Sequence, residues 1–251
     1  MNVEEYHRMR AHEETYWWFQ GRRRILLNTL RDNISISRDD KPSSQPRLLD
    51  VGCGTGMLLE GLKSAGWTVG LDMSPVALAY CRGRKLQNTM QGNAIYLPLR
   101  GNSIDIITAI DVIEHADDDK AVVNELYRTL KPGGLVIMTV PAHKGLWSPH
   151  DVALHHKRRY EKEEFLRLVK TAGFQPVKYT HIFSAVYVPV MIYRCARRWL
   201  ARPGAPSRTD EFPLPRFVNA CLRNIVYAEA SWLSRHDLPF GTSLLCVARK
   251  P

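Results

Sequence analysis

Short apolar runs alternate along the chain with longer stretches in which apolar residues recur at helical spacing. The apolar runs lie near 47–51, 67–71, 89–92, 104–110 and 134–140, and the helical stretches lie near 56–65, 75–86 and 118–130. Short apolar runs bounded by turn residues indicate buried strands. Their alternation with helices predicts an α/β fold, in which a doubly wound and mostly parallel sheet is covered by helices on both faces.

Two further strands bring the expected sheet to seven. A helix near 161–172 leads into a strand through Val177–Tyr179, and Thr242–Arg249 is an apolar strand that returns to the sheet. The interval between these strands is longer than a simple crossover needs. It carries helical stretches near 183–200 and 214–233, separated by the loop Ala201–Pro206.

The segment that joins the first expected strand to the next helix carries three alternating glycines, Gly52, Gly54 and Gly56, directly after Asp50 and Val51. Glycine adopts positive φ readily and lets a ligand lie against bare backbone. The N–H groups at a helix start favour an electron-rich ligand group. The dinucleotide fingerprint G-x-G-x-x-G would require glycine at Met57, so the spacing disfavours a nicotinamide enzyme.

The other strands also end in polar residues, at the edge of the sheet where open parallel sheets bind their ligands. The second strand ends at Asp72, 20 residues after Gly52, where a carboxylate can accept both hydroxyls of a ribose. The third strand is followed by Asn93, whose amide suits the edge of a base. The fourth and fifth strands are followed by Asp111–His115 and by His143.

Together these motifs resemble the class I S-adenosylmethionine-dependent methyltransferases, and within them the type 11, ubiquinone-biosynthesis-like family. The residues that carry the resemblance are Asp50, Gly52, Gly54, Gly56, Asp72, Asn93–Ala94, Asp111–His115 and Leu130–Gly134. The resemblance covers residues 46–180 and implies a Rossmann-like fold with S-adenosylmethionine as the cofactor.

The resemblance assigns a set of residues to the cofactor: Asp50, Gly52, Gly54, Gly56, Asp72, Met73, Asn93, Ala94 and Asp111. It places Asp50 near the methionyl part, Asp72 on the ribose hydroxyls and Met73 on the adenine. Asn93 stands where the family usually has aspartate, and its carbonyl can still accept from the adenine amino group. The structural alternative is that Asp50 and Asp72 cap the helices that follow them.

Methyl transfer needs in-line placement of the acceptor, and a base where the acceptor is a hydroxyl or a protonated amine. The segment 143–160 concentrates histidine, arginine and aromatic residues after the fifth strand. Histidine serves as a base near neutral pH, and paired arginines suit a phosphate or carboxylate. The catalytic candidates are His143, Asp151 and His156, and the substrate-binding candidates are Trp147, Arg158, Arg159 and Tyr160. An exposed basic loop is the alternative.

No metal site is expected, because no cysteine lies at ligand spacing beside these histidines. Glu114 and His115 are interpreted as structural, with catalysis as the alternative. Asp117–Asp119 are interpreted as negative charge at a helix N-terminus.

Residues 1–32 read as a charged helix interrupted by the aromatic cluster Tyr16–Phe19. The resemblance implies a lid helix here, with aromatics over the cofactor and acceptor and an arginine near an anion. The substrate-binding candidates in it are Trp17, Trp18, Arg22 and Arg23. The alternative is an amphipathic helix packed on the sheet.

These elements predict a core with two additions. Residues 1–46 are expected to form the N-terminal lid helix and a polar linker. Residues 47–182 and 241–251 are expected to form the methyltransferase core, and residues 183–240 a helical cap insert.

The net charge of +10 lies in the second half of the chain: residues 1–141 hold 17 basic and 17 acidic residues, and residues 142–251 hold 18 and 8. This excess indicates an anionic partner, with a solvated basic face as the alternative. The apolar segment 182–193 precedes Arg194, Arg197 and Arg198 and is too short to span a bilayer. It predicts a cap helix or homodimer contact, with a peripheral membrane position as the alternative.

The five cysteines are scattered and no secretory segment opens the chain, so a cytoplasmic setting is expected, with peripheral membrane association as the alternative. The expected function is S-adenosylmethionine-dependent O- or N-methylation of a small anionic or amphipathic acceptor, free or lipid-linked. One alternative is an RNA methyltransferase, which is disfavoured because no RNA-binding motif is visible. The other is a non-catalytic cofactor-binding or scaffold module, which the glycine loop and Asp72 disfavour.

Overall fold

The computed structural model describes residues 3–34, 45–200 and 214–251. Within them one sheet has seven strands in the order β3-β2-β1-β4-β5-β7-β6. The strands are β1 Arg47–Val51, β2 Trp67–Asp72, β3 Thr89–Gln91, β4 Ile104–Ile110, β5 Leu130–Pro141, β6 Gln175–Ile182 and β7 Ser243–Arg249. The first five are parallel, and β7 lies antiparallel between β5 and β6. The predicted doubly wound, mostly parallel α/β fold is confirmed.

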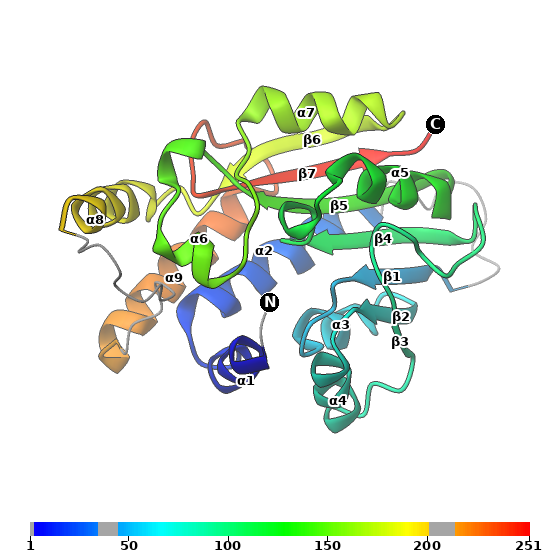
Figure 1. Ribbon diagram of the computed structural model, residues 1–251, viewed down its shortest axis with the longest axis horizontal. Coiled ribbons are helices and arrows are strands. Elements are labelled where there is room, and N and C mark those ends of the chain that lie inside the picture. The colour runs from blue at the N-terminus through cyan, green and yellow to red at the C-terminus, as the bar shows by residue number, and fades with distance from the viewer. Residues whose placement is uncertain (1–2, 35–44, 201–213) are drawn as a thin grey trace.

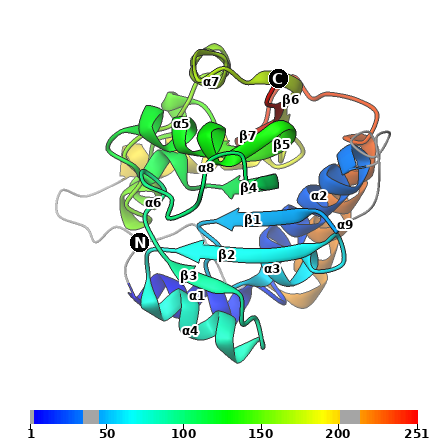
Figure 2. The ribbon, with the colours of Figure 1, turned by 90° about the vertical axis from the view of Figure 1, so that its right-hand side faces the viewer.

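Helices cover both faces of this sheet (Figure 1, Figure 2). They are α1 Val3–His12, α2 Trp17–Ile34, α3 Met57–Leu62, α4 Pro75–Gly83, α5 Asp119–Thr129, α6 Pro149–Ala153, α7 Lys162–Thr171, α8 Tyr187–Leu200 and α9 Arg216–Trp232. On one face α5 and α7 bury Leu126 and Phe165 against the strands. On the other face α2 and α9 lie side by side and bury Leu26 and Val226.

Two helices begin where the sequence predicts. The Ser74 hydroxyl accepts the N–H of Ala77 at 3.4 Å and caps α4, with Pro75 in its first turn. The Asp118 carboxylate accepts the N–H of Ala121 at 3.0 Å and caps α5. The interpretation of Asp117–Asp119 as helix-start charge agrees with this geometry.

Several boundaries differ from the prediction by a few residues, and two of the differences follow from the backbone conformation. β5 begins at Leu130, before the turn that the sequence predicts. The strand can include the turn residues because its pairing with β4 shifts register between Ile104 and Ile106, and because Gly133 takes a positive φ of 77°. Helix α8 begins at Tyr187, because Phe183 has a positive φ of 60° that a helix cannot contain. The loop Ala201–Pro206, linker residues 35–44, and the side chains of Arg197 and Arg198 lie outside the described residues.

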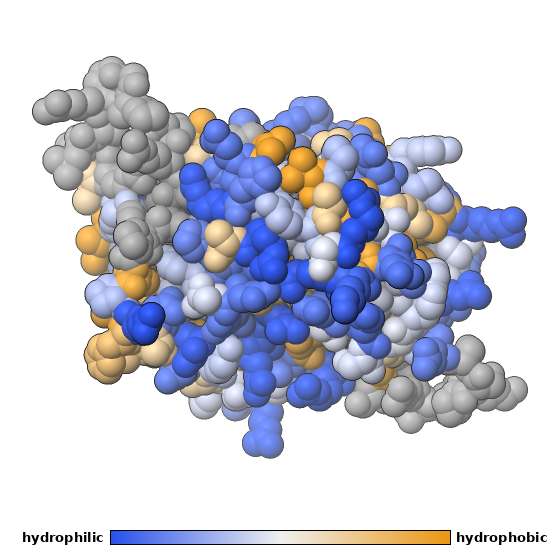
Figure 3. Space-filling view, turned by 90° about the horizontal axis from the view of Figure 1, so that it is seen from below, coloured by the Kyte–Doolittle hydropathy of each residue, from blue (hydrophilic) through white to orange (hydrophobic). Residues whose placement is uncertain are grey.

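The outward sides of α8 and α9 carry exposed apolar side chains, which gather at the left of Figure 3. They include Val188, Ile192, Phe217, Val218 and Ile225. Among the described residues, no helix combines the length and apolar character that a bilayer crossing requires. A cap, a homodimer contact and a peripheral membrane contact stay predictions for this face.

Candidate functional site

A cavity of about 400 Å³ opens at the carboxyl ends of the strands, where the order of the sheet reverses between β1 and β4. Helices α1, α2, α6 and α8 complete its walls. The predicted site residues that line it are Trp17, Trp18, Arg22, Arg23, Asp50, Gly52, Gly54, Asp72, Met73, Asn93, Ala94, Asp111, His156 and Arg159. The N-terminal aromatic cluster and the segment 143–160 therefore meet in one cavity.

The glycine loop brings bare backbone to the cavity floor. Gly52 and Gly54 both have positive φ, at 70° and 54°. A Cβ atom on Gly52 would lie 2.4 Å from Cγ2 of Val112, so only glycine fits there. Gly56 lies outside the cavity lining, and a Cβ atom on it would lie 2.6 Å from Leu86. Close packing against Leu86 and against Cys81 of α4 accounts for that glycine.

The Asp72 carboxylate is 5% exposed and already has three hydrogen-bond donors. Its Oδ2 accepts the N–H of Gly54 at 2.9 Å, and its Oδ1 accepts the N–H of Ser74 at 2.8 Å. The Tyr6 hydroxyl of α1 donates to Oδ1 at 3.2 Å. Burial and the charge of Asp72 raise the pKa of Tyr6, so the phenol stays protonated and donates. Helix α1 thus lies directly over this carboxylate.

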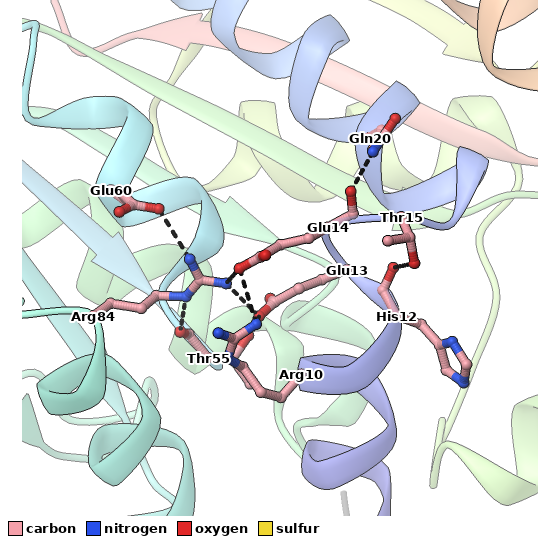
Figure 4. A network of polar contacts seen from close by, with 9 residues as sticks. All are labelled: Arg10, His12, Glu13, Glu14, Thr15, Gln20, Thr55, Glu60 and Arg84. Atoms are coloured by element: carbon pink, nitrogen blue, oxygen red, sulfur yellow. Dashed lines mark hydrogen bonds and ion pairs between the residues drawn. The ribbon is translucent and has the colours of Figure 1, made fainter. Parts of the chain in front are cut away.

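A network around Arg84 holds the N-terminal segment against the glycine loop (Figure 4). The guanidinium lies 2.6 Å from Glu13, 2.9 Å from Glu14 and 2.9 Å from Glu60. Its Nε donates to the carbonyl of Thr55 at 3.1 Å, and the Thr55 hydroxyl donates to Glu13. These pairs were not predictable from the sequence, because Arg84 is more than sixty positions from either N-terminal glutamate.

Asp50 is a buried carboxylate at the end of β1, with 2% of its surface exposed. The Thr108 hydroxyl donates to its Oδ1 at 2.6 Å. Burial raises the pKa of Asp50 to about 7, helped by the negative charge of Asp72. Its charge therefore changes near neutral pH.

The remaining cofactor candidates differ in how strongly they are held. Met73 is 66% exposed at the rim of the cavity. The Asn93 side-chain oxygen accepts the N–H of Ile95 at 3.1 Å, which leaves it one further lone pair. Asp111 accepts the Thr139 hydroxyl at 2.8 Å and pairs with Arg22 at 2.6 Å. That ion pair joins α2 to the end of β4.

The aromatic residues of α2 form the opposite wall. Trp18 stacks on Phe183 with ring centroids 5.8 Å apart. The Arg22 guanidinium lies 4.3 Å from the centroid of Trp18. This wall is packed on the body of the protein and also lines the cavity. Its predicted role as a lid over cofactor and acceptor stays a prediction.

Asp151 binds two polar residues that line the cavity, His156 and Arg159. Its own side chain is fully buried and does not line the cavity. Its Oδ1 contacts Nδ1 of His156 at 2.9 Å and accepts from Nε of Arg159 at 2.8 Å. Its Oδ2 accepts the N–H of Ser148 at 2.9 Å. Burial alone would raise the pKa of Asp151, but the hydrogen bond from His156 and the charge of Arg159 hold it well below its usual value.

Glu114 is a second buried acid, beside the other nitrogen of that imidazole. Its Oε1 lies 3.9 Å from Nε2 of His156, and the side chain is fully buried. Neither carboxyl oxygen of Glu114 has a hydrogen-bond partner among the described residues. Burial and the negative charge of Asp111 raise its pKa well above the usual value. The sequence interpretation as a helix-start anion missed this position on the cavity wall.

Glu114, His115 and His156 also form the one group in the described part of the chain with metal-site spacing. Their ligand atoms lie within 4.8 Å of one another. Burial and the charge of His156 lower the pKa of His115 to about 4, which keeps its imidazole neutral. The sequence expectation of no metal stays a prediction, because this spacing alone does not require an ion.

Besides Asp151, four candidates from the segment 143–160 lie outside the cavity lining, namely His143, Trp147, Arg158 and Tyr160. His143 stacks on His181 with ring centroids 5.2 Å apart. Arg158 donates to the carbonyls of Ala116 and Asp117, and the buried Tyr160 donates to Asp119 at 2.8 Å. These contacts position the loop, and the geometry does not favour direct contact of the four with substrate.

Comparisons with known proteins agree with this geometry. A family profile described as "Methyltransferase domain" matches residues 49–138. A probable S-adenosylmethionine-dependent methyltransferase of Mycolicibacterium smegmatis is 30% identical over 167 residues, which are 65% of this chain and 61% of that protein. Residues 49–138 therefore carry a methyltransferase domain, and the chain is similar to the type 11 family of class I S-adenosylmethionine-dependent methyltransferases. This match spans less than two thirds of the mycobacterial relative.

One further relative and two solved structures of similar fold extend the comparison. The ubiquinone biosynthesis O-methyltransferase of Photorhabdus laumondii is 27% identical over 76% of this chain and 87% of its own length. A possible histamine N-methyltransferase of Thermotoga maritima shares the fold with a TM-score of 0.56, at 18% identity, covering 99% of this chain and 96% of that one. A Haloferax volcanii methyltransferase in complex with its Trm112 activator has a TM-score of 0.59 at 19% identity, covering 99% and 95%.

The cofactor of this methyltransferase is S-adenosylmethionine. The residues present fit it on two observations. The glycine loop leaves backbone uncovered at the cavity floor, where a Cβ atom would collide. Two buried carboxylates, Asp50 and Asp72, face the same cavity from adjacent strands, which suits a ligand with both a cation and hydroxyl groups.

Proposed function

We propose that this methyltransferase transfers a methyl group from S-adenosylmethionine to a hydroxyl of an anionic or amphipathic small molecule. The observation that carries the proposal is the Asp151–His156 pair, an imidazole held by a buried carboxylate on the wall of the cofactor cavity. A hydroxyl acceptor needs a base, and the O-methyltransferase name of the Photorhabdus relative supports the same chemistry. N-methylation of a protonated amine is the alternative.

The cofactor would be held by residues at the ends of β1, β2 and β3. When bound, S-adenosylmethionine supplies a methyl group on a sulfonium, which is already electrophilic. In this proposal Asp72 accepts the ribose hydroxyls, Asp50 faces the methionyl ammonium, and Met73 packs on the adenine. Helix α1 covers this end, since Tyr6 and Met9 line the cavity above it.

His156 would remove the proton of the acceptor hydroxyl. With Nδ1 bound to Asp151, Nε2 is the nitrogen left to take that proton. Asp151 stabilises the imidazolium that forms, as a buried carboxylate beside a histidine does in other enzymes. Burial raises the pKa of Glu114, which lies 3.9 Å from Nε2 of His156, and so disfavours a negative charge beside that nitrogen. A negative charge there would stabilise the protonated imidazole and oppose its role as a base.

A methyl-transfer assay tests the proposed function. The protein is incubated with methyl-labelled S-adenosylmethionine and, separately, 3,4-dihydroxybenzoate, catechol, tyramine and bulk tRNA. Label is expected in the dihydroxybenzoate and less in catechol, which lacks the carboxylate. Label confined to tRNA would indicate an RNA methyltransferase instead. Binding of S-adenosylhomocysteine without label in any acceptor would favour a non-catalytic module.

Cofactor affinity is expected to rise between pH 6 and pH 8. Asp50 has its pKa raised to about 7, so below that value the free protein holds a neutral carboxyl that cannot pair with an ammonium. Binding of the ammonium favours the charged form, so it releases a proton near pH 7, and affinity increases until the carboxyl is ionised. Titration calorimetry of S-adenosylhomocysteine in two buffers of different ionisation enthalpy measures that proton. Asp50→Asn should remove the pH dependence, and an unchanged slope in that variant would contradict the assignment.

A further inference from the structure

Helix α9 is apolar on two opposite sides. One side is buried, and Val226 and Ala230 there pack in the same cluster as residues of α2 and the sheet. The other side carries Phe217, Ile225 and Trp232, which are 77%, 45% and 56% exposed. Their spacing places them together on one side of the helix. A surface helix with a single buried side has polar residues in these positions, so the outer side of α9 is unusual.

The outer side of α8 adds to this apolar surface. Val188 and Ile192 are one helical turn apart and are 49% and 60% exposed. The outward apolar side chains of both helices gather at the left of Figure 3. We call this surface the α8–α9 face and define it by Val188, Ile192, Phe217, Ile225 and Trp232. Single exposed apolar residues are normal, but a group of this size marks a surface that binds something.

The helices that form and support the face are strongly basic. Together α2, α8 and α9 contain nine arginines, and their two acids are Asp32 and Glu229. The Glu229 side chain is buried and accepts the backbone N–H groups of Phe183 and Ala185. It therefore places no negative charge on the outer surface of α9.

Arginines border the face on α9 and on the adjacent α2. Arg216 at the start of α9, Arg235 just after its end and Arg24 on α2 are all exposed. Arg24 and Arg223 lie 5.7 and 6.0 Å from the ring centroid of Tyr227 on α9. Within the described ranges, none of these four arginines has an ion-pair partner. Exposed apolar side chains bordered by such cations are typical of helices that lie in the interface of an anionic membrane.

A second copy of this chain fits the face less well than a membrane does. A symmetric contact would place the same arginines of two chains opposite each other. The whole chain has a net charge of +10, so two copies also repel each other at longer range. Anionic lipid headgroups supply the opposite charge instead. The amphipathic ring of Trp232 also suits the interface between headgroups and acyl chains.

We propose that the α8–α9 face binds the surface of an anionic lipid bilayer, with its apolar side chains in the interface and the bordering arginines at the lipid phosphates. Helix α8 then lies between the bilayer and the cavity, because Val190 on its inner side lines the cavity. The methyltransferase is thereby held with its site beside the membrane. This interaction goes beyond the proposed function and does not depend on which acceptor is methylated.

Flotation of the full chain with lipid vesicles tests the proposal. Vesicles of phosphatidylcholine are compared with vesicles in which about a third of the lipid is phosphatidylglycerol. The protein is expected to bind the anionic vesicles about tenfold or more tightly, and to lose most of that preference in about 1 M salt, because salt screens the arginines. Equal binding to both kinds of vesicle, or binding to neither, would overturn the proposal.

The apolar part of the face is tested by the double variant Phe217→Asn, Trp232→Asn. It should bind the anionic vesicles about tenfold less tightly, since two side chains no longer enter the interface. The matched control is Trp67→Asn, which changes a tryptophan that is 48% exposed at the start of β2. The control should bind as the unmodified protein does. Equal losses in the control and in the double variant would contradict the assignment to α9.

The charged part is tested by the double variant Arg216→Gln, Arg235→Gln, which should lose most of the preference for phosphatidylglycerol. Its control is Arg167→Gln, which changes an exposed arginine of α7 and should keep the preference. Sedimentation velocity of the unmodified protein addresses the other occupant. A dimer that Phe217→Asn dissociates, together with no binding to vesicles, would assign the face to a second copy and overturn the proposal.

Discussion

Replacing Asp72 with alanine is expected to lower the affinity for S-adenosylmethionine and S-adenosylhomocysteine by about 100-fold or more. The carboxylate faces the cavity at the end of β2 and in the proposed complex accepts two ribose hydroxyls. Two hydrogen bonds to a charged group contribute about 3–6 kcal/mol together, which sets the size of the loss. Titration calorimetry at pH 8, where Asp50 is ionised, measures it.

The control for this prediction separates binding from folding. Asp72 also accepts the N–H groups of Gly54 and Ser74, so the thermal unfolding midpoint of the variant must be measured alongside. Asp72→Asn keeps one acceptor oxygen and should bind with intermediate affinity. Tyr6→Phe removes only the hydroxyl that donates to the same carboxylate, and it should bind as tightly as the unmodified protein or more tightly. Affinity of Asp72→Ala within threefold of normal would refute the ribose assignment.

Replacing His156 with asparagine is expected to lower kcat by about 10²–10⁴-fold with little change in cofactor affinity. The imidazole is the proposed base, and general-base catalysis contributes that range. The reaction is single-turnover transfer of labelled methyl to 3,4-dihydroxybenzoate, followed from pH 6 to pH 9. A phenol that is already ionised at high pH no longer needs a base to remove its proton. The activity of the variant should therefore rise toward that of the unmodified protein as pH increases.

Two companion variants make this prediction specific. Asp151→Asn removes the charge that stabilises the imidazolium and should lower kcat by a smaller factor than His156→Asn. His143→Asn changes a histidine outside the cavity and should leave kcat within about twofold of normal. Activity that is lost with EDTA and restored by a divalent cation would assign His156, with Glu114 and His115, to a metal site in place of the base role.

The fold was largely predictable because its signals are local in sequence. Each parallel strand is an apolar run, and caps such as Ser74 and Asp118 mark the next helix within three residues. The cofactor end of the site was predictable for the same reason. Parallel strands place their carboxyl ends at one edge, so Asp50 and Asp72 had to lie near each other.

The acceptor end was not predictable to the same extent, because it depends on contacts between segments far apart in sequence. By residue type alone, His143 and His156 are equally suited to act as a base. The three-dimensional path of the loop distinguishes them, because it places His156 on the cavity wall and His143 against His181. Glu114 follows β4 in a motif that also serves structure. Nothing in the sequence shows that its carboxyl oxygens are buried and have no hydrogen-bond partner in the described part of the chain. The inward position of Arg194, which lines the cavity with Val190, was likewise not predicted from the sequence.

The position of β7 has a consequence for how the protein is made. β6 pairs with β7 and with no other strand of the sheet, and β7 also pairs with β5. A nascent chain that has emerged only as far as α9 therefore has β6 without a partner and one edge of β5 open. The sheet closes in a late step, when Ser243–Arg249 leaves the ribosome and enters between two strands that were made before it. Until then the strand edges of β5 and β6 are open to pairing with other chains, unless helices or chaperones cover them.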